Sequence, residues 1–144
     1  MSFSFDPDDE VHLRALARLE SEQIVWLVTS GRDGYPHAVP VWFLWLDGKA
    51  VIFSEPRTAK VANIRANDKV ALHLEAGPDG EQLTVLRGTA QLFDDAGPEW
   101  VESIGDDYTA KYDEGLRRLN LTTASMLDRY TTVIEFTPAT LLAW

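Results

Sequence analysis

Residues 35–46 carry apolar side chains at nearly every position. Because side chains alternate between the two faces of a β-strand, this pattern predicts a strand that is covered on both faces. One face can line a barrel interior, whereas the other needs a ligand, a helix or a second subunit. Pro36 and Pro40 have the same parity, and proline is tolerated only where no neighbouring strand needs its N–H group. The strand is therefore expected to have one open lateral edge, with the backbone groups of Val39 and Val41 free to contact something else.

The rest of the chain has the pattern of hairpin-connected strands with a few helices. Apolar runs bounded by turn residues predict five further strands, at residues 23–30, 49–54, 69–76, 82–94 and 130–137. Apolar side chains spaced three or four residues apart predict three helices, the last one broken by glycines, over residues 6–20, 58–66 and 98–119. Gly88 marks a β-bulge, and Pro138 is expected to end the last strand. This inventory predicts one mainly β domain spanning residues 1–144, a small antiparallel barrel of six strands with peripheral helices.

Composition narrows the class of protein. With 45% hydrophobic residues and no cysteine, the chain can bury a core but has no disulfide framework, thiolate metal site or cysteine nucleophile. Its apolar runs are shorter than a membrane span, and its acidic N-terminus differs from the basic start of a signal peptide. We therefore expect a cytoplasmic protein with no membrane partner. The net charge of −10 argues against a nucleic acid partner, which requires a basic surface.

Positive charge is concentrated in one segment, which also holds the most informative group of polar side chains. Residues 54–69 have a net charge of +2, with four basic side chains against two acidic ones. Such a cationic island on an acidic protein favours one small anionic ligand over a polymer. The island begins where a strand passes into a helix, and helix N-termini present unpaired N–H groups that favour phosphate.

Arginine supplies a planar fork and lysine a point charge, a combination that suits phosphate oxygens. The candidate phosphate-binding residues are Ser54, Arg57, Thr58, Lys60 and Asn63. The alternative is a solvated helix whose basic side chains make only weak surface ion pairs.

Other residues offer less specific signals. His12, His37 and His73 lack partners at zinc-site spacing, so no metal is expected. His37 lies on the open-edged strand, where it can contact a ligand or be satisfied within the barrel wall. Residues 31–34, Gly-Arg-Asp-Gly, form a hairpin turn rather than a dinucleotide-binding loop. Three tryptophans can stack on a flat ring, although such residues more often belong to a core or a subunit interface: Trp42, Trp45 and Trp100.

The order of several motifs resembles one known family. These motifs are Gly-Tyr-Pro-His-Ala-Val-Pro-Val-Trp-Phe at 34–43, Ser-Glu-Pro-Arg-Thr-Ala-Lys-Val-Ala-Asn-Ile at 54–64, and Gly-Thr-Ala at 88–90. Together they resemble the split β-barrel flavin/deazaflavin oxidoreductase superfamily, which is related to pyridoxamine phosphate oxidase. Within it the chain is similar to the actinobacterial deazaflavin-dependent reductases, which use coenzyme F-420. The likeness covers residues 9–92 well and the last strand loosely.

This resemblance implies a six-stranded antiparallel split β-barrel that forms a homodimer, with the cofactor ring in a groove at the interface. It implies that Arg57 and Lys60 hold the cofactor phosphate, and that other side chains assist them: Ser54, Thr58 and Asn63. It also implies that three residues present their backbone to the polar edge of the ring: Val39, Pro40 and Val41.

The implied function is an oxidoreductase that transfers a hydride between a reduced deazaflavin and an unsaturated small-molecule substrate. Water, a backbone donor or His37 can protonate the product. Three alternatives stay open: an FMN-dependent enzyme of the same fold, a binding protein that holds a flavin or haem without turnover, and an interaction module. Pyridoxamine phosphate oxidase proper carries a Trp-x-x-Arg-Leu-like segment near its C-terminus. Residues 137–144 contain no arginine, which argues against that particular activity.

Overall fold

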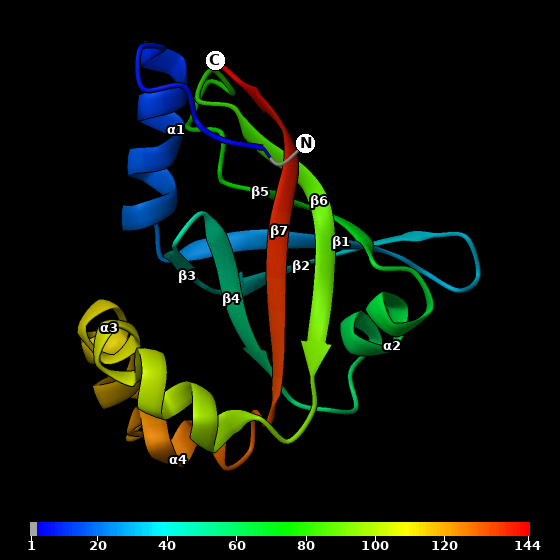
Figure 1. Cartoon of the computed structure of the whole chain (residues 1–144), viewed down its shortest axis with the longest axis vertical. Coiled ribbons are helices and arrows are strands. Elements are labelled where there is room, and N and C mark those ends of the chain that lie inside the picture. The colour runs from blue at the N-terminus through cyan, green and yellow to red at the C-terminus, as the bar shows by residue number, and fades with distance from the viewer. Residues whose placement is uncertain (1–2) are drawn as a thin grey trace.

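Seven antiparallel strands form one curled sheet in the computed structural model, which describes residues 3–144 (Figure 1). In chain order the strands are β1 (Ile24–Ser30), β2 (Pro36–Trp42), β3 (Leu44–Leu46), β4 (Lys49–Ser54), β5 (Lys69–His73), β6 (Thr84–Phe93) and β7 (Thr132–Ala143). The helices of the described chain are α1 (Glu10–Ser21), α2 (Ala59–Ala66), α3 (Gly97–Arg118) and α4 (Thr123–Leu127). Across the sheet the strand order is β2-β1-β5-β6-β7-β4-β3, which makes a half-barrel and confirms the mainly β class.

The sheet has seven strands rather than the predicted six because the apolar segment 35–46 breaks at Phe43. β2 and β3 are consecutive in the chain but lie at opposite edges of the sheet. The chain therefore passes from one edge to the other through a single residue, and the sheet must curl to bring those edges together. Phe43 is fully buried, and its backbone N–H donates to the hydroxyl of Tyr112 instead of to a strand.

β2 is an edge strand, as the prolines predicted, and it pairs with β1. In an antiparallel pair, each residue points its N–H and C=O to the same side, and successive residues alternate. Pro36 and Pro40 have no N–H to donate to β1. The backbone groups of the even-numbered residues of β2 therefore point to its free edge. Val39 and Val41 have the opposite parity and lie across from Leu27 and Val25 of β1. The expectation that the backbone of Val39 and Val41 is free is therefore wrong, and the free carbonyl in this stretch belongs to Pro40.

Two apolar clusters hold the fold together. The first fills the barrel interior with side chains from β1, β4, β5, β6 and β7, among them Leu27, Ile52 and Phe136. The second packs α3 and α4 against the other face of β3, β4 and β7, at the lower left of Figure 1. α3 has non-helical angles at Tyr112, so the predicted break lies between its two internal glycines rather than at either of them.

Several predicted boundaries shift. The Gly88 bulge is confirmed, and a Cβ at Gly88 would lie 2.0 Å from the carbonyl oxygen of Thr137. Because the bulge places Pro138 opposite Gly88, β7 continues through that proline to Ala143 instead of ending there. α1 begins after Asp9, whose side chain caps the helix, and not after Asp6. Within residues 3–144 the structure has no helix long and apolar enough to cross a membrane.

Candidate functional site

The turn between β4 and α2 is fixed by the hydroxyls that the sequence singled out. The Thr58 hydroxyl caps α2 by accepting from the N–H of Val61 at 3.4 Å. Ser54 is buried, and its hydroxyl donates to the carbonyl oxygen of Glu55 at 2.8 Å and lies 3.3 Å from the Thr58 hydroxyl. Both hydroxyls therefore shape the turn that positions the neighbouring basic side chains.

Asn63 attaches α2 to the sheet. Its side-chain amide donates to the hydroxyl of Thr29 on β1 at 3.0 Å, and both residues are buried. An isolated helix of eight residues is marginal in water, so α2 depends on such tertiary contacts. Asn63 thus fixes the position of α2 relative to β1.

The basic residues of the island divide into engaged and free side chains. Arg65 makes a two-pronged ion pair with Asp94, at 2.9 and 3.2 Å. Glu55 pairs with Arg129 at 2.8 Å. Arg57 is exposed and makes no hydrogen bond or ion pair within residues 3–144. Lys60 is half-buried, and burial lowers its pKa while nearby Glu55 opposes that shift. The structure therefore leaves Arg57 and Lys60 available to an anion.

Two clefts flank the first turn of α2. One, of about 610 Å³, runs along the exposed side of the helix and includes Arg57, Thr58 and Arg65. The other, of about 510 Å³, lies between α2 and the start of β2 and includes His37 and Asn63. Arg32, from the β1–β2 turn, lines both clefts. Sequence reasoning missed Arg32 because its approach to α2 depends on how far the hairpin extends, which no local pattern reports.

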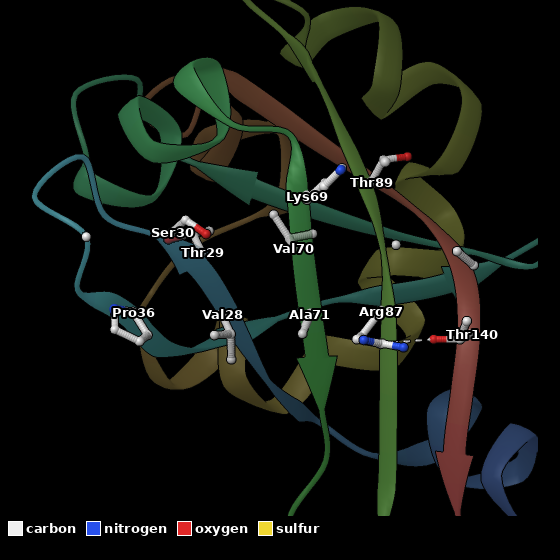
Figure 2. A pocket seen from close by; sticks show the side chains of 13 residues that line it. Val28, Thr29, Ser30, Pro36, Lys69, Val70, Ala71, Arg87, Thr89 and Thr140 are labelled. Carbon is white, nitrogen blue, oxygen red and sulfur yellow. Dashed lines mark hydrogen bonds between the residues drawn. The ribbon is translucent and has the colours of Figure 1, made fainter.

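The outer face of the sheet, which points away from the barrel interior, carries a third groove of about 580 Å³ (Figure 2). Figure 2 shows Val28, Ala71, Arg87 and Thr140 in one row, as the strand register requires. The Arg87 guanidinium donates to the Thr140 hydroxyl at 3.3 Å. The groove continues toward Pro36 at the start of β2. Its lining is mostly apolar, and its basic side chains are those of Lys69 and Arg87.

β2 continues this apolar outer face. The even-numbered residues Pro36, Ala38 and Pro40 are exposed, whereas the odd-numbered His37, Val39 and Val41 are half-buried. The expectation that both faces of this strand are covered is therefore not met within the chain. On the outer face nothing in residues 3–144 covers the prolines.

The aromatic side chains pack within the chain. Trp42 stacks on Tyr112 with ring centroids 4.4 Å apart, and it lies against Gly115, where a Cβ would be 2.9 Å from the indole. Trp45 is buried against Phe5. The third of these tryptophans, Trp100, packs on Phe93. These positions make all three indoles part of the fold.

The histidines lie apart from one another. The His12 ring accepts from the N–H of Asp6 at 2.9 Å, and His73 stacks on Trp26. His37 has its Nδ1 atom buried with no hydrogen-bond partner in the described chain. Residues 3–144 contain no cluster of three His, Asp or Glu side chains that could hold a metal ion.

A family model described as pyridoxamine 5'-phosphate oxidase matches residues 12–144. This chain belongs to the pyridoxamine 5'-phosphate oxidase family. The resemblance to the superfamily related to pyridoxamine phosphate oxidase, inferred from the motifs, is thereby confirmed. A comparison with curated protein sequences gives no match.

Solved structures share the fold of this pyridoxamine 5'-phosphate oxidase family member. An F-420 reductase has a TM-score of 0.67 at 21% identity, over 88% of this chain and 94% of that chain. A conserved hypothetical protein from Mycobacterium tuberculosis has a TM-score of 0.73 at 18% identity, over 100% and 89%. A FAD-binding protein from Mesorhizobium loti has a TM-score of 0.64 at 19% identity, over 90% of both chains. At these identities the likeness shows the fold alone.

Proposed function

We propose that this protein is an oxidoreductase that transfers a hydride between reduced coenzyme F-420, a deazaflavin, and an unsaturated small-molecule substrate. The observation that carries the proposal is a pair of cations at the start of α2 that have no ion pair within residues 3–144: Arg57, which lines a cleft, and the half-buried Lys60, which lies beside it in the chain. Elsewhere in the segment the basic side chain of Arg65 is already paired with Asp94. The residues present therefore fit a phosphorylated cofactor.

The cofactor phosphate would be held at the start of α2. Arg57 would supply a planar fork and Lys60 a point charge, each making a charge-assisted hydrogen bond. Half-burial removes part of the water around the Lys60 ammonium group. Because an anion can take the place of that water, its contact with Lys60 is more favourable. Ser54 and Thr58 would assist by keeping the turn in shape, and Asn63 by anchoring the helix to β1.

The ring would lie along the free edge of β2. Pro36 and Pro40 prevent another strand from adding there, and the carbonyl of Pro40 faces outward between Val39 and Val41. When bound, a reduced deazaflavin supplies a hydride donor. The protein would orient it against the substrate and exclude water. His37, which lines the neighbouring cleft, is the candidate for protonating the product.

A second copy of the chain would cover the outer face of the sheet. This part of the proposal is supported by the exposed Pro36, Ala38 and Pro40 and by the apolar groove of Figure 2 that adjoins them. Light scattering should give twice the chain mass, and Val28→Glu should give the mass of one chain. A wild-type protein of single-chain mass would remove the dimer from the proposal.

The cofactor assignment is tested by fluorescence titration with coenzyme F-420. Lys60→Ala should weaken binding by at least tenfold, because a hydrogen bond to a charged group contributes about 1.5–3 kcal/mol. Lys49→Ala is the matched control, since Lys49 lies at the opposite end of β4 and pairs with Glu135. Unchanged affinity in Lys60→Ala would remove the phosphate site.

FMN is the second candidate cofactor, because a phosphate cluster serves both molecules and one structural neighbour is named a FAD-binding protein. Titrating FMN in parallel separates the two. Incubation of the loaded protein with enones or quinones then separates an enzyme from a protein that only holds its flavin or haem. Oxidation of the bound reduced cofactor by substrate alone is the expected result.

A further inference from the structure

His37 has one ring nitrogen that is buried and one that is accessible at the cleft between α2 and β2. The residue lies opposite Thr29 of β1 and points to the same face of β2 as Val39 and Val41. Its Nδ1 atom is buried and has no hydrogen-bond partner within residues 3–144. Nε2 makes no hydrogen bond within these residues either, but it is not buried. The accessible part of this half-buried ring therefore includes Nε2, at a residue that lines the cleft.

The burial of Nδ1 determines which nitrogen holds the ring proton. A neutral imidazole has one N–H donor and one acceptor nitrogen. Among buried backbone groups, an N–H without an acceptor is rarer than a carbonyl without a donor, and we expect the same order for ring nitrogens. The neutral ring of His37 therefore keeps its proton on Nε2. It presents an N–H donor to the cleft.

The α2–β2 cleft has no excess of charge on its lining. The charged residues that line it are Arg32 and Asp33, which have opposite signs. The other cleft beside α2 differs, because its charged lining residues are all basic: Arg32, Arg57 and Arg65. An ionised group is costly to bury unless an opposite charge pairs with it. A cleft with balanced charge and a neutral N–H donor therefore suits an uncharged oxygen better than a phosphate.

We propose that His37 is a specificity-determining residue whose Nε2–H donates to an uncharged oxygen of a ligand in the α2–β2 cleft. This oxygen is either a hydroxyl of the polyol chain of the cofactor or a carbonyl of its ring or of the substrate. The inference rests on the proposed function for the class of ligand. It concerns binding, and it holds whether or not His37 also protonates the product.

The position of the ring proton is tested in the free protein, so this measurement does not depend on any cofactor. A two-bond proton–nitrogen NMR spectrum, recorded on nitrogen-15-labelled protein in alkaline solution, shows which nitrogen of each histidine holds the proton. His12 accepts at Nδ1 from the N–H of Asp6, so it is the reference for a proton on Nε2. In His73, Nδ1 lies 3.2 Å from the Leu74 carbonyl oxygen, so it is the reference for a proton on Nδ1. His37 should match His12, and a match to His73 would overturn the inference.

Binding is tested with probes that have no phosphate group. Riboflavin carries the polyol chain, lumiflavin has a methyl group in its place, and menadione offers quinone carbonyls. Their dissociation constants are measured by NMR titration for the wild type, His37→Leu and His37→Gln. His37→Gln is the matched control, because the side-chain amide of glutamine can place an N–H group near the position of Nε2.

His37→Leu should weaken the binding of at least one probe by about threefold or more, as expected for one hydrogen bond between uncharged groups. His37→Gln should stay within about twofold of the wild type. A loss for riboflavin alone assigns the oxygen to a hydroxyl of the polyol chain, and a loss for lumiflavin or menadione assigns it to a carbonyl. No loss for any probe, equal losses in the two variants, or no binding by the wild type would overturn the inference. The coenzyme F-420 titration of Lys60→Ala judges the proposed function separately.

Discussion

Replacement of Tyr112 by phenylalanine tests how the half-barrel is closed. The Tyr112 hydroxyl accepts from the N–H of Phe43 at 2.8 Å and lies 2.6 Å from the carbonyl oxygen of Gln23 and 2.9 Å from that of Phe43. Because the hydroxyl has one proton, it donates to one of these two carbonyls. α3 therefore satisfies the backbone at the single residue through which the chain passes between the two edges of the sheet.

The magnitude follows from the groups left without partners. In Tyr112→Phe the buried N–H of Phe43 loses its acceptor, whereas the Phe43 carbonyl keeps the Lys111 ammonium at 2.6 Å. An unsatisfied buried group costs about 1–3 kcal/mol, and the lost hydroxyl donation adds roughly 1 kcal/mol. The variant should lose about 2–4 kcal/mol of unfolding free energy. The stacking on Trp42 is retained, because it involves only the ring.

Urea unfolding measures this change, with Tyr108→Phe as the control. Tyr108 is as deeply buried as Tyr112, but its hydroxyl donates only to the Met126 sulfur at 3.9 Å, a weak acceptor. Tyr108→Phe should therefore cost less than about 1 kcal/mol. Equal losses in the two variants would refute the claim that the Tyr112 hydroxyl holds the crossing residue.

Three further predictions concern packing and pH. Gly88→Ala should cost about 2 kcal/mol or more in urea unfolding, since its Cβ would lie 2.0 Å from the Thr137 carbonyl oxygen; a neutral result would contradict the tight bulge. Asn63→Ala should cost about 1–2 kcal/mol by leaving the buried Thr29 hydroxyl unpaired, and a calorimetric melt unchanged from the wild type would contradict this. Burial lowers the pKa of Lys111 from 10.5 to about 8, so between those values the unfolded chain binds more protons and stability rises with pH. The free energy of unfolding should be measured against pH for the wild type and for Lys111→Met. Across that range the wild type should gain on the order of 1 kcal/mol of stability relative to Lys111→Met, after allowance for solvent screening. A loss of stability would contradict the direction of the pKa shift.

Most strands were predictable because their signals are local. The turn residues around β1, β4 and β6 and the bulge glycine lie within or beside the elements that they delimit. The prolines of β2 revealed an open edge, because a missing N–H is a property of the residue itself. The backbone groups that face this edge belong to residues with the same parity as the prolines. Val39 and Val41 have the opposite parity, so the expectation for them was wrong.

The remaining features depend on contacts between distant segments. The break at Phe43 is held by Tyr112, which is 69 residues away in the chain, so an unbroken apolar run gave no sign of it. Trp42 was a candidate for stacking on a ligand ring, but its indole packs against Tyr112 of α3. Arg32 lies in a common type of turn sequence, which does not indicate that its side chain lies near α2. Arg57 and Lys60 could be proposed from the sequence because a strand, a turn and a helix start follow one another directly.

The structure of the protein with coenzyme F-420 bound tests the central claim most directly. We predict that the phosphate lies within hydrogen-bond distance, about 2.7–3.2 Å, of both the Lys60 ammonium and the Arg57 guanidinium, with the ring along the free edge of β2. A phosphate bound elsewhere, with the start of α2 facing only solvent, would contradict the account.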